Sequence, residues 1–215
     1  MHPAFSVIFL TTLIGAGQGL FLALVTAQVY SAVELVTVKE SGTFYAIGSM
    51  FALALLVAGL VSSVFHLGRP ERAWRAAAMW RTSWLSREVI ALPAFMGIVF
   101  IYAVVHGFGL DFTVVKLNTD VTIPFTIIIG IIGTLLCFAL FVCTGMIYAA
   151  IKFLQEWATP LTLVNFILLG MASGFSIATV YAAYQAPELI NLFAGWALLL
   201  TVASAITRIS SLVRN

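Results

Sequence analysis

Six long apolar stretches recur along this chain, and they constrain its fold more than any other feature. We place them at residues 4–36, 44–66, 89–107, 121–153, 160–186 and 189–207. Each is close to or above the roughly 20 residues that an α-helix needs to cross about 30 Å of hydrocarbon. Strands of a membrane barrel would alternate with period two over about ten residues. The sequence therefore predicts an all-α integral membrane protein, a bundle of about six transmembrane helices.

The composition supports a single membrane domain. Only 8% of the 215 residues are charged and 62% are hydrophobic, whereas soluble domains are about 25% charged. A surface so poor in charge cannot face water, so we expect one transmembrane helical domain over residues 1–215, surrounded by lipid and without a nucleic-acid partner. The first apolar run is longer than the core of a signal peptide, and we interpret it as a retained helix.

The basic residues predict the orientation in the membrane. With six spans, both termini and the loop at residues 67–88 lie at the same end. Eight of the ten Lys and Arg residues belong to that end: Arg69, Arg72, Arg75, Arg81, Arg87, Lys152, Arg208 and Arg214. Because loops rich in Lys and Arg stay inside, we expect both termini and this loop to be cytoplasmic.

The loop at residues 67–88 contains five arginines and three tryptophans. One interpretation is an interfacial anchor, in which the tryptophans lie among lipid headgroups and the arginines face phosphate. The compact group from Arg69 to Arg72 also suits docking to carboxylates on a partner protein. We expect Arg69, Arg72, Arg75 and Arg81 to take part in such docking.

Two ionisable residues lie at the membrane boundary on either side of this loop. His66 ends the second apolar stretch, and a neutral imidazole there can hydrogen-bond a quinone headgroup and move a proton near neutral pH. It could equally bond a neighbouring backbone carbonyl. Glu88 opens the third stretch, where it is either part of the same site or a carboxylate that stabilises a helix N-terminus.

Other polar residues within the apolar stretches are few. Gln18 lies inside the glycine-rich run at residues 15–19, and an amide in hydrocarbon needs a partner on another helix or on a ligand. The spacing Gly15-x-x-x-Gly19 recurs as Gly170-x-x-x-Gly174 and favours close helix approach. Tyr148 could border the same pocket as His66, or it could be an interfacial tyrosine beside a snorkelling lysine.

Haem and iron–sulfur clusters are not expected in this chain. A membrane haem usually needs two histidines at similar depth, and His106 lies at the far end of the third span from His66. His2 precedes the first helix. Cys137 and Cys143 fall on different faces of one span, and the chain contains no Cys-x-x-Cys run. We therefore predict no metal site.

Four segments carry a resemblance to a known family. HPAFSVIF at 2–9, GAGQG at 15–19, FHLGRPERAW at 65–74 and TSWLSRE at 82–88 resemble the membrane-anchor subunit of the dimethyl sulfoxide reductase family, a branch of the polysulfide-reductase-type membrane subunits. This resemblance implies a subunit without a prosthetic group or catalytic residues of its own. It also implies that quinone binds beside an iron–sulfur subunit, which connects to a molybdopterin subunit.

The resemblance extends to particular positions. The family's histidine associated with quinol binding falls on His66, and its early histidine falls on His2. Arg69, Arg72 and Glu88 match family positions in the same loop. Related anchors typically have about eight helices where six are visible here, so the contribution of further helices to the site stays open.

The orientation bears on the expected substrate. A cytoplasmic arginine-rich loop is more similar to the anchor of cytoplasmic sulfite-oxidising quinone oxidoreductases than to that of outward-facing reductases. We therefore expect electrons to pass from sulfite, through a molybdopterin subunit and a four-cluster ferredoxin-like subunit, to ubiquinone or menaquinone in the bacterial cytoplasmic (inner) membrane. The alternatives are an outward-facing S- or N-oxide reductase that uses quinol, a small transporter, and a tether without a quinone site.

Overall fold

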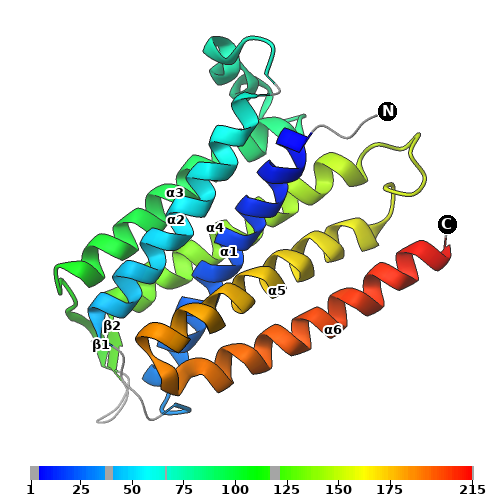
Figure 1. Ribbon diagram of the computed structural model, residues 1–215. Helices are drawn as coiled ribbons and strands as arrows, with labels where there is room; N and C mark the ends of the chain where they lie inside the picture. Colours follow the sequence, from blue (N-terminus) through cyan, green and yellow to red (C-terminus); the bar gives the residue numbers. More distant parts are fainter. Residues whose placement is uncertain (1–4, 37–40, 66, 117–121, 215) are drawn as a thin grey trace.

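The chain folds into six long helices, which confirms the predicted fold class. The computed structural model describes residues 5–36, 41–65, 67–116 and 122–214. All six helices are long and apolar enough to cross a membrane. Their bounds are α1 Phe5–Ala32, α2 Gly42–Val64, α3 Trp84–Gly107, α4 Phe125–Ala149, α5 Pro160–Gln185 and α6 Ile190–Arg214 (Figure 1).

Several helix ends differ from the prediction because apolarity does not by itself distinguish helix from extended chain. The fourth helix begins at Phe125, since the residues before it form β2 (Thr122–Pro124), which pairs antiparallel with β1 (Thr113–Lys116). β-branched residues dominate both segments and favour an extended backbone. The first helix ends at Ala32, four residues before the predicted boundary.

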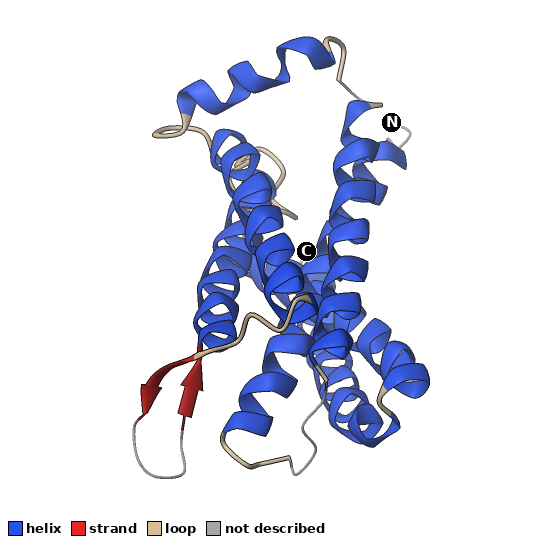
Figure 2. Ribbon diagram, turned by 90° about the vertical axis from the view of Figure 1, so that its left-hand side faces the viewer, coloured by secondary structure: helices blue, strands red, loops and turns tan. Residues whose placement is uncertain are grey.

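Two short 3₁₀ helices complete the described fold, and neither was predicted. The longer, η1 (Pro70–Met79), projects beyond the bundle at the end where α2 stops and α3 starts (Figure 2). The shorter, η2 (Pro187–Leu189), turns the chain from α5 into α6. Each begins at a proline, whose fixed φ angle suits the first residue of a helix.

The two glycine pairs pack α1 directly against α5. A Cβ atom at Gly174 would meet the backbone of Gly19 and Leu20, and a Cβ atom at Gly19 would lie 3.0 Å from the Cα atom of Gly174. Only a residue without a side chain permits this approach. The predicted role of the glycine spacing is confirmed, and α1 also packs against α2 and α4.

Aromatic side chains fill the middle of the bundle. Phe21 packs edge-on against Phe95 and Tyr102, with ring centroids 5.4 Å apart in both pairs. All three side chains are fully buried. They form an apolar layer between the polar groups at the two ends of the bundle.

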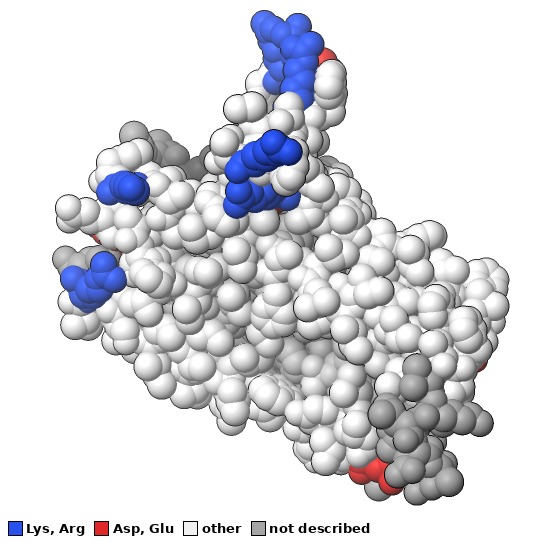
Figure 3. All heavy atoms as spheres, turned by 180° about the vertical axis from the view of Figure 1, so that it is seen from behind, with Lys and Arg blue, Asp and Glu red and all other residues white. Residues whose placement is uncertain are grey.

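The charged side chains are distributed unevenly between these ends. The described Lys and Arg side chains gather where α1, α3 and α5 begin, which we call the basic end (Figure 3). Glu34, Asp111 and Glu188 lie at the other end, which we call the acidic end. This arrangement agrees with the charge pattern from which the orientation was predicted.

Candidate functional site

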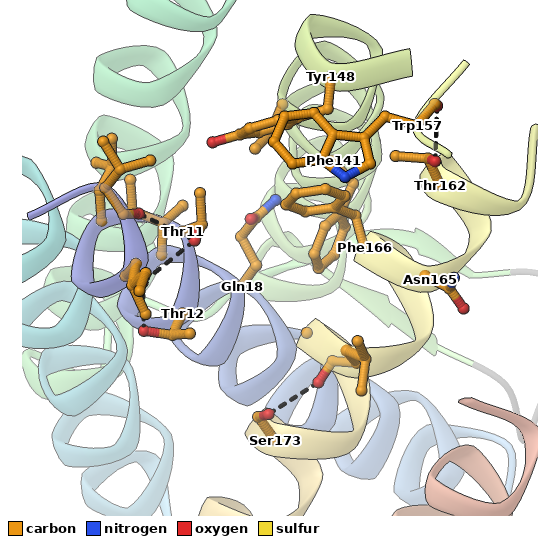
Figure 4. Close-up of a pocket in the computed structure, with 18 of the residues that line it drawn as sticks. Thr11, Thr12, Gln18, Phe141, Tyr148, Trp157, Thr162, Asn165, Phe166 and Ser173 are labelled. Carbon is orange, nitrogen blue, oxygen red and sulfur yellow. Dashed lines mark hydrogen bonds between the residues drawn. The ribbon is translucent and has the colours of Figure 1, made fainter. Parts of the chain in front are cut away.

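A cavity of about 680 Å³ opens at the basic end between α1, α4 and α5 (Figure 4). One wall includes Phe141, Thr144 and Tyr148 of α4, and α3 contributes Glu88. α6 contributes Arg208 beside the loop between α4 and α5. The cavity therefore runs from the membrane boundary into the bundle.

Three of the residues predicted to bind quinone meet in this cavity. Gln18, Glu88 and Tyr148 come from three different helices and all line it. Thr144 lies about 10 Å further along α4 than Cys137, the partner of Gln18, and Tyr148 follows about 6 Å beyond, at 1.5 Å per residue. His2 and His66, the other two predicted residues, lie outside the described part of the chain.

Gln18 forms the deepest polar group of the cavity. It lies midway along α1 and is 1% exposed. Its Nε2 donates to the backbone oxygen of Cys137 at 2.9 Å, which confirms that the amide finds a partner on another helix. Because a carbonyl oxygen can only accept, this bond determines the orientation of the amide. Oε1 is then left without a hydrogen bond among the described residues.

Glu88 lies one turn inside α3. Thr144 of α4 donates its hydroxyl to Oε1 of Glu88, while the second carboxyl oxygen has no hydrogen bond among the described residues. The N-terminus of α3 is capped instead by Ser83, whose side chain accepts from the backbone N–H of Ser86 at 3.4 Å. The carboxyl of Glu88 is therefore held towards the cavity rather than used as a cap.

Tyr148 belongs to an aromatic group near the mouth of the cavity. Its ring stacks on Phe166, with centroids 5.2 Å apart and planes 18° apart, and meets the edge of Trp157 at 5.4 Å. Its hydroxyl makes no hydrogen bond among the described residues. Sequence reasoning did not identify Trp157 or Phe166, because their contact with Tyr148 depends on how α4, α5 and the intervening loop fold together.

A second polar cluster, also missed from the sequence, lies at the acidic end. The side chain of Gln28 accepts from the Tyr102 hydroxyl at 2.7 Å and donates to Thr126 at 2.6 Å. Thr126 in turn donates to Asp111 at 3.1 Å. His106, which the sequence placed at this end, packs its ring 4.5 Å from that of Tyr102. These contacts connect α1, α3 and α4 on the far side of the aromatic layer.

The four arginines predicted to dock a partner are exposed around η1. Arg75 lies over the ring of Trp74 at 5.5 Å, and Arg81 lies over Trp80 at 5.3 Å. Both tryptophans are more than half exposed. An exposed surface that combines guanidinium groups with aromatic rings suits binding to a protein or to lipid headgroups.

The fifth arginine of the loop has a structural role. Arg87 donates to the backbone oxygens of Trp80 and Arg81 at 2.9 Å each, and its guanidinium lies 4.2 Å from the ring centroid of Trp84. These bonds hold the end of the loop against the first turn of α3. The loop therefore meets the bundle in a defined position beside Glu88.

Comparison with known proteins identifies the family. A model of the family described as DMSO reductase anchor subunit (DmsC) matches residues 1–215. The chain belongs to the DMSO reductase anchor subunit family. The resemblance recognised in its motifs is thereby confirmed.

Within this anchor family, the chain is similar to a sulfite dehydrogenase subunit of Allochromatium vinosum. The two are 55% identical over 215 residues, which is all of this chain and 66% of the relative. The chain thus spans just under two thirds of that relative's length. No solved structure matches it.

Proposed function

We propose that this anchor protein binds quinone and passes electrons between an iron–sulfur subunit and the quinone pool, with sulfite as the electron donor of the complex. The observation that carries the proposal is the cavity at the basic end. Its wall presents Gln18 Oε1, the second oxygen of Glu88 and the Tyr148 hydroxyl, all without partners among the described residues. Family membership supports the role of an anchor, and the relative named as a sulfite dehydrogenase subunit supports sulfite.

The cavity matches the chemistry of a quinone headgroup. A quinone ring is flat and apolar on its faces, and the aromatic rings of Tyr148, Phe166 and Phe141 offer surfaces for stacking. Its two oxygens need hydrogen-bond donors in the oxidised form, whereas the quinol hydroxyls need acceptors. The cavity holds both kinds of group.

Each polar residue has a distinct part in this proposal. Reduction of quinone consumes two protons, and Glu88 is placed to supply one because its carboxyl reaches the cavity from close to the membrane boundary. Thr144 holds that carboxyl in position. The Tyr148 hydroxyl donates to a quinone oxygen, and Gln18 Oε1 accepts from a quinol hydroxyl. His66 and His2 remain predicted members of the same site.

The partners follow from the position of the cavity. The four exposed arginines Arg69, Arg72, Arg75 and Arg81 would bind a four-cluster ferredoxin-like subunit, which brings electrons from a molybdopterin subunit. Glu88 follows this loop directly, so the docked subunit would lie close to the cavity. We propose that this end faces the cytoplasm from the bacterial inner membrane.

The test compares two electron-transfer activities of the purified complex. Glu88→Gln should lower reduction of a water-soluble quinone analogue by about 100-fold, as expected for loss of a positioned proton donor. Sulfite-dependent reduction of an artificial dye by the soluble subunits should not change. Glu188→Gln, an exposed carboxylate at the acidic end, is the matched control. Equal activity of both variants with quinone would refute the role of the cavity.

The description of the family favours a second candidate, an outward-facing reductase that uses quinol. The same cavity would then oxidise quinol, and the arginine-rich loop would face away from the cytoplasm. Sulfite-dependent quinone reduction by the purified complex supports the first proposal. Quinol-dependent reduction of dimethyl sulfoxide without sulfite oxidation supports the second.

A further inference from the structure

The cavity has a second opening on the membrane-facing side of the bundle. Helices α1 and α5 touch at their glycines and then separate towards the basic end, so that the cavity lies between their first halves (Figure 1). Thr12 of α1 and Ser173 of α5 lie on the two sides of this gap (Figure 4).

The residues along the gap are exposed although they line the cavity. Ile8 is 43% exposed and Leu169 is 47% exposed, and Thr12 and Ser173 are exposed as well. All four belong to membrane-spanning helices, so their exposed surface would face hydrocarbon. The gap therefore connects the cavity with the lipid, in addition to the mouth beside Tyr148.

The hydroxyl groups at the gap do not make it polar. Thr12 donates to the backbone oxygen of Ile8 at 2.7 Å, and Ser173 donates to that of Leu169 at 2.8 Å. Because each hydroxyl is satisfied within its own helix, neither needs water or a ligand. The surface left for an occupant consists mainly of methyl, methylene and isobutyl groups.

We propose that the gap between α1 and α5 is the portal through which the isoprenoid tail of the quinone leaves the cavity and enters the lipid. This inference rests on the proposed quinone-binding function. The headgroup would lie at the polar wall near Glu88, and the tail would pass between Thr12 and Ser173. Small side chains at the portal leave this path open, whereas a large ring would obstruct it.

The experiment varies the tail while keeping the headgroup. Ser173→Trp should raise the KM for a quinone with a decyl or longer tail roughly tenfold, the effect of losing burial of about two methylene groups. The KM for the same quinone without a tail should stay within about twofold, since the headgroup contacts are unchanged. Ser176→Trp is the matched control, because Ser176 is also exposed on α5 but does not line the cavity.

A second variant approaches the portal from its other side. Thr12→Trp on α1 should reproduce the dependence on tail length, and it provides the test if Ser173→Trp fails to assemble. An unchanged KM for the long-tailed quinone, or an equal rise for quinones with and without a tail, would overturn the portal. Absence of quinone-linked activity in the unmodified complex would instead refute the proposed function itself, so the two failures are distinguishable.

Discussion

The contact between α1 and α5 allows a sharp test of the packing. We expect Gly174→Ala to destabilise the protein, because the added methyl group would meet the backbone of Gly19 and Leu20. Backbone atoms cannot rotate away as a side chain can, so the two helices must separate. Overpacking a closely packed interior costs about 1–3 kcal/mol, and this substitution should lie at the upper end of that range.

The measurement is the thermal unfolding midpoint of the purified protein in detergent. For a chain of this size, 1 kcal/mol corresponds to a change of about 2–4 °C in Tm, so Gly174→Ala should lower Tm by roughly 5–10 °C. Gly195→Ala in α6 and Gly97→Ala in α3 are matched controls, since a Cβ atom at either position meets nothing within 4 Å. Their Tm should not fall. Equal Tm values for Gly174→Ala and Gly195→Ala would refute the reasoning.

Three further predictions follow from the described contacts. Thr144→Val removes the hydroxyl that holds Glu88 and should lower quinone turnover several-fold; Thr134→Val, whose hydroxyl bonds only its own helix, should leave turnover unchanged. Tyr102→Phe leaves a buried oxygen of Gln28 without its donor at 2.7 Å and should lower the free energy of unfolding by about 1–3 kcal/mol, measured by thermal unfolding. A fluorescent protein fused to the C-terminus should fluoresce in intact cells, because that terminus is expected in the cytoplasm; an active periplasmic alkaline phosphatase fusion would reverse the orientation.

Some of the site could be predicted because the reason lies in single residues. Gln18 stood out as an amide in hydrocarbon, and Glu88 as a carboxylate at the start of a span. Both line the cavity, and Gln18 has the interhelical partner that its position required. The identity of that partner, the backbone oxygen of Cys137, could not be predicted, since every residue of every helix carries such an oxygen.

Other parts of the site had no signal in the sequence. Trp157 and Phe166 resemble ordinary residues of a loop and an apolar helix until Tyr148 is placed between them. Gln28 and Tyr102 are separated by 74 positions, and their hydrogen bond depends on the rotation of α1 against α3. The strands β1 and β2 were also missed, because their apolar residues continued the pattern of the neighbouring helix.

Apolar length determined that this chain forms six membrane helices, and the charges determined the end at which most Arg and Lys side chains gather. The glycine spacing predicted close contact involving α1 and α5. Only the tertiary structure decided which helix faces meet and where the cavity opens. The physical reason is that a helix in lipid is apolar on all sides, so hydrophobic periodicity does not distinguish a packed face from a lipid-facing one. Side-chain shape and a few interhelical hydrogen bonds make that distinction, and both depend on residues far apart in the sequence.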